Sequence, residues 1–219
     1  MSGDGQEVER LEADLRELVA TVREPHLAAL LGRFFGEAAP AWQRFRVAPA
    51  AKHFHHAYAH GLLEHCLTVA QGVGALSATF GGIDRDVAVT GALLHDIGKL
   101  EAYTAEPHDR ELTTAGRLQG EIALGYFAVR REIEAMAGFP PDLAQAVLHI
   151  ILSHHGSLEH GSPVRPCTRE ATLVHFVDNL GGRLGSFDRL ERDLPDGAAW
   201  SGFDRALGSG AYFAGREAA

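Results

Sequence analysis

One segment limits the possible folds of this chain more than any other: the apolar run from Gly91 to Leu100, which reads GALLHDIGKL. Its apolar spacing predicts a helix, and the doublet His95-Asp96 lies in the last turn of that helix. Packing explains an imidazole next to a carboxylate poorly, whereas neighbouring nitrogen and oxygen ligands suit a divalent metal. The doublet therefore indicates a metal site that other segments must complete.

Three other helical segments offer the missing ligands. A single inward histidine is more often a satisfied core residue, and a histidine at a helix C-terminus is favoured by the helix dipole alone. An aspartate within the apolar stretch 171–180 is harder to explain, because a buried carboxylate is costly without a cation beside it. In chain order, the candidates are His65, the pair His154 and His155, and Asp178.

Helical periodicity extends along the rest of the chain, and no stretch keeps the alternation of a β-strand. We therefore expect an all-α fold. An irregular segment is expected through Pro40 and Pro49, and Gly98 is expected to end the helix that carries the doublet. Apolar spacing and capping signals predict helices over 6–36 with a break near Pro25, then over 62–76, 85–97, 118–137 and 141–155, and after Thr168.

Two segments fall outside these helices. Residues 102–119 are polar and mixed, and we expect a loop over the site with a candidate lid between Tyr103 and Arg117. The chain as a whole is expected to form one compact unit, with an N-terminal helical extension over 1–48 and the main domain over 49–219. The Gly-rich C-terminal stretch is expected to pack its aromatic side chains back onto the bundle, namely Trp200, Phe203, Tyr212 and Phe213.

Composition narrows the function. The chain has 219 residues and a formal net charge of −9, which argues against a protein that holds long nucleic acid through phosphate contacts. A small or single-stranded phosphate substrate remains open, because a bound metal adds local positive charge. Cys66 and Cys167 form no C-x-x-C pair, and no apolar run reaches the length of a membrane span, so we expect a cytoplasmic protein without membrane contact.

The order His65, then His95-Asp96, then Asp178 resembles that of the HD-domain metal-dependent phosphohydrolases. Over about residues 50 to 185 the chain is similar to the catalytic domain of YhaM-type 3'-5' exoribonucleases. The segments that carry this similarity are HHAY at 55–58, GLLEHCLTVA at 61–70, GALLHDIGK at 91–99, ILSHHG at 151–156 and GSPVRP at 161–166. The resemblance implies an HD-domain helical bundle over residues 49–219.

The resemblance also implies roles for single residues. A first divalent ion would be held by His65, His95, Asp96 and Asp178, and Lys99 would approach the phosphate or a bridging water, so that Asp96 and Lys99 are the catalytic candidates. His154 and His155 match a second site in dinuclear members. There the family pattern has a histidine where this chain reads Gly120-Glu-Ile122, so Glu121 would complete that site. The pattern usually has glycine at the position of His60.

We therefore expect one or two ions of Mn, Fe, Mg, Co, Ni or Zn, and a metal-activated water that attacks a phosphoester. His56 and Arg165 are candidates for substrate contact. YhaM-type enzymes carry an OB-type domain before the catalytic part, whereas the first fifty residues here read as helical, which favours a nucleotide or short single-stranded oligonucleotide as substrate. Two alternatives stay open: an HD-type di-iron oxygenase, and a non-catalytic nucleotide-binding regulatory protein.

Overall fold

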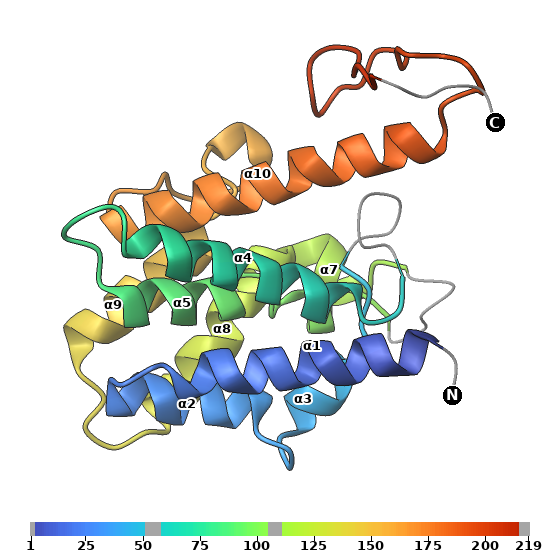
Figure 1. Cartoon of the computed structure of the whole chain (residues 1–219). Helices are drawn as coiled ribbons and strands as arrows, with labels where there is room; N and C mark the ends of the chain where they lie inside the picture. Colours follow the sequence, from blue (N-terminus) through green and yellow to red (C-terminus); the bar gives the residue numbers. More distant parts are fainter. Residues whose placement is uncertain (1–2, 51–57, 105–110, 215–219) are drawn as a thin grey trace.

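The computed structural model describes residues 3–50, 58–104 and 111–214, and within these ranges the regular structure is helical, without a β-strand. The expected all-α class is therefore confirmed. Helices α4 and α5 lie at the centre, α10 runs along one side of them and α1 to α3 along the other (Figure 1). The helices are α1 (Gly3–Ala20), α2 (Pro25–Phe35), α3 (Pro40–Phe45), α4 (Gly61–Ser77), α5 (Arg85–Leu94), α6 (Lys99–Ala102), α7 (Thr114–Gln119), α8 (Glu121–Glu134), α9 (Pro141–Ser153) and α10 (Arg169–Arg192), with a 3-10 turn η1 (Leu158–His160).

Helix α5 is the central element of the bundle. It begins at the cap Asp84, whose carboxylate accepts hydrogen bonds from the Asp86 and Val87 backbone, and it is buried at every position from Val87 to Leu94. Helices α4, α9 and α10 pack around it. A helix that is apolar on all sides is stable only when neighbours cover each face, so the sequence of α5 itself requires this arrangement.

Helix α5 ends earlier than expected, at Leu94 rather than Ile97, so His95 and Asp96 follow the helix instead of forming its last turn. Gly98 has φ −66° and is no left-handed helix stop. Its role is close approach: a Cβ there would lie 2.0 Å from the Glu121 carbonyl oxygen and 2.4 Å from the Gly125 nitrogen of α8. The glycine thus lets the turn that carries the doublet rest directly on the α8 backbone.

Two segments expected to be irregular contain helices. Pro40 begins α3, where its fixed φ suits the first helical turn, and the helix buries Trp42 and Phe45. Thr113 caps α7 by accepting a hydrogen bond from the Gly116 backbone, so residues 114–119 are helical rather than part of a loop. The expected lid also includes residues 105–110, which lie outside the described residues.

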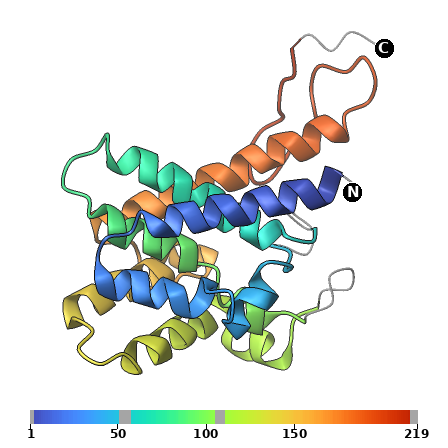
Figure 2. The same cartoon turned by 60° about the horizontal axis from the view of Figure 1, so that its bottom comes forward.

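The C-terminal aromatic residues do not pack as expected. Phe213 meets the bundle, where its ring centroid lies 6.3 Å from that of Phe187 on α10. Trp200, Phe203 and Tyr212 are 64%, 74% and 56% exposed, so the expectation is wrong for these three. The segment instead lies beside the C-terminal half of α10 and projects beyond the bundle (Figure 2).

The N-terminal helices share the core of the main bundle. Leu11 and Leu15 of α1 belong to the same continuous hydrophobic cluster as the α4, α5, α9 and α10 side chains. The division into an extension over 1–48 and a domain over 49–219 stays a prediction. Among the described helices, none combines the length and the apolarity that a membrane crossing requires.

The close approach at Gly98 gives a stability prediction. Gly98→Ala puts a Cβ against backbone atoms that cannot turn aside, and we expect a loss of about 3 kcal/mol in the free energy of unfolding, at the upper end of overpacking effects. The matched control is Gly32→Ala in α2, where a Cβ meets nothing within 4 Å and a small gain is expected. Urea unfolding of both variants measures this, and equal midpoints would contradict the role given to Gly98.

Candidate metal centre

Four helices deliver the predicted ligands to one place. His65 comes from the buried face of α4, Asp178 from the middle of α10, His95 and Asp96 from the turn after α5, and His154 from the end of α9. His65, His95, Asp96 and His154 are buried. Most of these side chains line a cavity of about 470 Å³, together with Lys99 and His155.

The ligand atoms lie at the separations that a shared ion requires. His65 Nε2 is 3.2 Å from His95 Nε2, 3.2 Å from Asp178 Oδ1 and 3.3 Å from Asp96 Oδ2. His95 Nε2 is 3.4 Å from Asp96 Oδ2 and 3.8 Å from Asp178 Oδ1. Atoms that each lie about 2.0–2.2 Å from one ion are roughly 3–4 Å apart, so this set fits a single first-row divalent metal.

Hydrogen bonds at two helix ends orient the imidazoles. His95 and His154 each follow the last residue of a helix, and each Nδ1 donates to a carbonyl three residues earlier, at 2.6 Å to Ala92 and 2.8 Å to Ile151. A carbonyl only accepts, so Nδ1 carries the proton and the Nε2 lone pair points into the cluster. Each bond also satisfies a carbonyl that a helix end would leave open.

Two buried atoms fit a bound cation. Asp96 Oδ1 and His154 Nε2 are buried, and neither has a hydrogen-bond partner among the described residues. They lie 3.7 Å from each other, which is too far for a hydrogen bond and suitable for two ligands of one ion. Buried polar atoms in folded proteins normally have a hydrogen-bond partner. A metal ion bound by Asp96 Oδ1 and His154 Nε2 would give both atoms the partner that the described residues do not provide. The imidazole and carboxylate donors suit Mn, Fe, Co, Ni or Zn.

The electrostatics of the cluster favour ligation. Burial and the neighbouring His95 lower the pKa of His154 to about 3, so its ring is neutral and its lone pair is available. Although burial opposes it, the carboxylates of Asp178 and Asp96 raise the pKa of His65 to about 9. In the absence of metal, His65 is thus protonated at pH 7 and faces both carboxylates through Nε2.

Lys99 neutralises part of the negative charge of the Asp96 and Asp178 carboxylates. Its Nζ donates to Asp96 Oδ2 at 2.6 Å, and its side chain also lines the cavity. Against the cost of burial, the ammonium of Lys99 and the ring of His95 hold the pKa of Asp96 well below its usual range. Asp96 therefore stays ionised and keeps its second oxygen, Oδ1, directed at His154.

The second predicted site is only partly assembled. Glu121 Oε1 lies 3.7 Å from His155 Nε2, and His155 Nδ1 donates to the His160 carbonyl at 2.9 Å. Within the described residues, however, His154 groups with His95 and Asp96, and Glu121, His154 and His155 do not gather within 4.8 Å. The structure brings Glu121 to His155 beside the first ligand set, and its role as a ligand stays a prediction.

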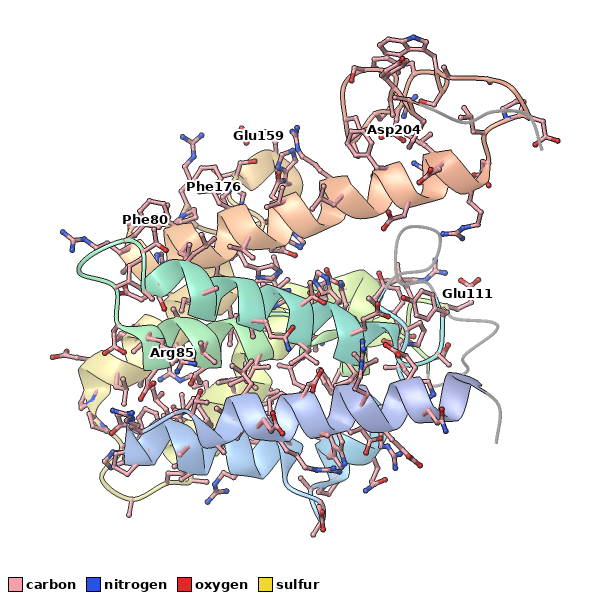
Figure 3. The ribbon with its side chains drawn as sticks, viewed as in Figure 1. Phe80, Arg85, Glu111, Glu159, Phe176 and Asp204 are labelled. Atoms are coloured by element: carbon pink, nitrogen blue, oxygen red, sulfur yellow. The ribbon has the colours of Figure 1, made fainter. Side chains whose placement is uncertain are left out.

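Of the residues predicted for substrate contact, Lys99 lines the cavity, and the structure places Arg165 outside its wall. His56 lies outside the described residues. Arg165 is exposed and does not line the cavity. Its charge is felt by the carboxylate of Glu159, and Figure 3 shows Glu159 projecting away from the bundle. The structure thus gives Arg165 no place in the cavity wall.

Sequence reasoning missed several residues of the cavity wall. Asn179, Gly182, Arg183 and Ser186 follow Asp178 at helical spacing along α10, a signal that could have been used. His175 donates from Nδ1 to the His154 carbonyl at 2.8 Å. Arg205 and Ala206 come from the C-terminal segment, and no local pattern marks them.

Two local features position the ligand-bearing segments. Gly156 has φ +82°, and a Cβ there would lie 2.1 Å from the His175 ring, so the glycine after His154-His155 permits that packing.

His60, at a position where the family that the chain resembles usually has glycine, is the one non-glycine residue with positive φ (71°) in the described ranges. It precedes α4, and its Nδ1 lies 2.5 Å from the Arg46 carbonyl oxygen. The family preference for glycine there has a backbone cause.

A larger cavity, of about 670 Å³, lies between α4 and α10 and contains none of the predicted ligands. Its wall is mostly apolar and includes Phe80 and Phe176, which lie near each other at one edge of the molecule (Figure 3). Chemistry that needs charged groups therefore belongs to the smaller cavity.

Comparison with known proteins agrees with this geometry. Residues 62–182 match the HD domain family, and this segment is more than half of the chain. The chain is 33% identical over 148 residues to the 3'-5' exoribonuclease YhaM of Bacillus subtilis, covering 67% of this chain and 46% of that protein. It is 32% identical over 154 residues to YhaM of Bacillus pumilus and of Geobacillus sp., covering 70% of this chain and 48% and 47% of those proteins. The chain thus spans about half the length of these curated relatives, and no solved structure matches it.

The protonated His65 predicts that metal binding releases a proton. Below pH 9 an ion must displace this proton, so at pH 7 about one proton should leave per ion, and the affinity should rise up to about tenfold per pH unit until pH 9. His154 is already neutral and adds none. Calorimetric titration with Mn²⁺ in two buffers of different ionisation enthalpy measures the release. Binding without proton release would contradict this state of His65.

The position of Glu121 predicts the metal stoichiometry. If its carboxylate holds a second ion with His155, Glu121→Ala should bind fewer ions or bind the second at least tenfold more weakly. Glu134→Ala, at the exposed far end of the same helix, is the matched control. Equal stoichiometry and affinity in wild type and Glu121→Ala would show that the centre holds one ion.

Proposed function

This chain belongs to the HD domain family, and we propose that it is a metal-dependent phosphohydrolase that cleaves a phosphodiester of a nucleotide or a short single-stranded oligonucleotide. One observation carries the proposal: the buried and unpaired Asp96 Oδ1 and His154 Nε2 face each other beside the ligand set of His65, His95 and Asp178. A site with these donors and an adjacent cavity suits water activation rather than packing.

A divalent ion bound by His65, His95, Asp96 and Asp178 would supply a water of lowered pKa and positive charge for the phosphoryl oxygens. The protein itself supplies orientation and charge. Lys99 is held by Asp96 at 2.6 Å on the cavity wall, where its ammonium can also donate to a phosphoryl oxygen. This interaction strengthens as negative charge develops on that oxygen, which is the condition for a catalytic rather than a merely binding contact.

The substrate class follows from the size and charge of the cavity. A volume of about 470 Å³ suits a nucleotide or a short oligonucleotide. The net charge of −9 opposes a long nucleic-acid track, whereas cationic side chains gather in this cavity. The relatives are named 3'-5' exoribonucleases, which supports a nucleic-acid phosphodiester as the bond that is cleaved.

The di-iron oxygenase and the non-catalytic nucleotide-binding protein remain alternatives without an observation in their favour among the described residues. An oxygenase would consume oxygen in its iron form. A regulatory binder would bind nucleotide and release no product. A lack of hydrolysis by the Mn²⁺-loaded protein would favour these alternatives, and oxygen consumption by the iron form would separate the oxygenase from the binder.

The direct test is hydrolysis by protein loaded with Mn²⁺. We expect cleavage of a dinucleotide at a higher rate than of a 20-mer of single-stranded RNA, measured at two salt concentrations. Asp178→Ala removes a predicted metal ligand and should reduce turnover by at least a thousandfold. A cooperative thermal unfolding transition would show that this variant is folded. Unchanged turnover in Asp178→Ala would refute the proposed site, and faster, steeply salt-dependent degradation of the 20-mer would refute the preference for short substrates.

Lys99 provides a second test of the mechanism. Lys99→Met keeps the length of the side chain and removes the ammonium, so kcat should fall by at least tenfold with a smaller change in KM and unchanged metal content. Lys99→Arg should restore part of kcat, because the cation remains. A Lys99→Met variant with normal kcat and reduced stability would assign Lys99 a structural role as the partner of Asp96.

A further inference from the structure

The C-terminal segment folds back on itself beside α10. Residues 199–213, here called the C-terminal hairpin, pair through antiparallel bridges between Trp200 and Tyr212 and between Asp204 and Ser209. The Phe213 nitrogen donates to the Ala199 carbonyl at 2.8 Å. This hairpin lies beyond the residues 62–182 that match the HD domain family, so the family resemblance assigns it no role.

One aspartate fixes the tip of the hairpin to the bundle. Asp204 Oδ2 accepts a hydrogen bond from Arg189 of α10 at 2.5 Å, and Figure 3 shows Asp204 next to that helix. Asp204 Oδ1 accepts from the backbone nitrogens of Ala206 and Leu207 at 2.9 and 3.0 Å. Both oxygens are thus engaged, and the turn that carries Arg205 is held in one orientation relative to α10.

Arg205 lines the same cavity as the candidate metal ligands. Arg183 of α10 lines it as well, and its Nε donates to Asn179 Oδ1 at 3.1 Å. Among the residues that the structure describes, neither arginine pairs with a carboxylate, and Arg205 makes no hydrogen bond through its side chain. The cavity therefore offers two guanidinium groups in addition to Lys99.

The charged side chains of this cavity differ in whether they have a partner of opposite charge. The charge of Lys99 is matched by Asp96 at 2.6 Å, and the remaining carboxylate, Asp178, belongs to the metal ligand set. The two arginines are left without an anion, although the protein as a whole carries a net charge of −9. A guanidinium presents a planar fork of donors that matches phosphate oxygens, so an anionic part of the ligand is the natural complement.

We propose that Arg205 of the C-terminal hairpin and Arg183 of α10 form a binding site for a second phosphate of the substrate, beside the phosphodiester that reaches the metal centre. The inference rests on the proposed function and specifies its substrate class: a short nucleotide ligand with two phosphates, such as a 5'-phosphorylated dinucleotide. Arg189 and Asp204 act as positioning residues, because they hold Arg205 at the cavity without lining it.

The test compares two substrates with the same cleavable bond. Protein loaded with Mn²⁺ is assayed on the dinucleotide ApA and on its 5'-phosphorylated form pApA. Wild type should have at least tenfold higher kcat/KM for pApA, mainly through KM, and Arg205→Ala should bring the ratio of the two kcat/KM values close to one. The control is Arg192→Ala, which removes an exposed arginine of α10 that does not line the cavity, and it should keep the wild-type ratio.

Two further measurements separate the possible failures. Asp204→Ala frees the tip of the hairpin without removing Arg205 and should lower the same ratio, with unchanged metal content and thermal unfolding. Binding of pApA to metal-free protein should weaken at least fivefold in Arg205→Ala. An unchanged ratio in Arg205→Ala overturns the second-phosphate site. If wild type cleaves neither dinucleotide, the proposed function fails, and equal pApA affinity of wild type and Arg205→Ala would then overturn this site independently.

Discussion

The burial of the Asp96 carboxylate is the main physical constraint on the arrangement of the candidate metal centre. Removing a carboxylate from water costs several kcal/mol unless cations and donors surround it. Lys99 provides one cation at 2.6 Å, while His65 and His95 approach the same oxygen at 3.3 and 3.4 Å. The other oxygen faces His154 and has no hydrogen-bond partner among the described residues, so a bound divalent ion would offset the remaining cost.

This requirement explains why helix ends, rather than helix faces, supply three of the five candidate ligands, His95, Asp96 and His154. His95 and His154 follow α5 and α9 in the same way, and each satisfies an open carbonyl of its own helix while it directs Nε2 inward. The close contact of Gly98 with α8 sets where the Asp96 turn rests. Tight backbone packing and ligand orientation are therefore two results of the same local geometry.

The C-terminal hairpin extends this centre without adding to the core. Its exposed aromatic side chains contribute little burial, and its attachment to α10 is an ion pair and one aromatic contact. The C-terminal hairpin, which completes the cavity wall, thus contacts α10 through Arg189 and Phe187, whereas the candidate ligands come from helices of the buried core.

The all-α class, most helix positions and the set of candidate ligands could be predicted from the sequence, because apolar spacing, caps and the His-Asp doublet are local signals. The sequence named His65, His95, Asp96, His154 and Asp178 as candidate ligands, and the structure brings all five together, while their role as ligands stays a prediction. That His154 faces Asp96 while Glu121 faces His155 could not be predicted, since these contacts depend on how α8 packs against α9. Arg205 reaches the cavity through the ion pair between Arg189 and Asp204, two polar residues fifteen positions apart that carry no periodic signal. Contacts of this kind are set by the packed arrangement of the chain, and the sequence alone does not reveal them.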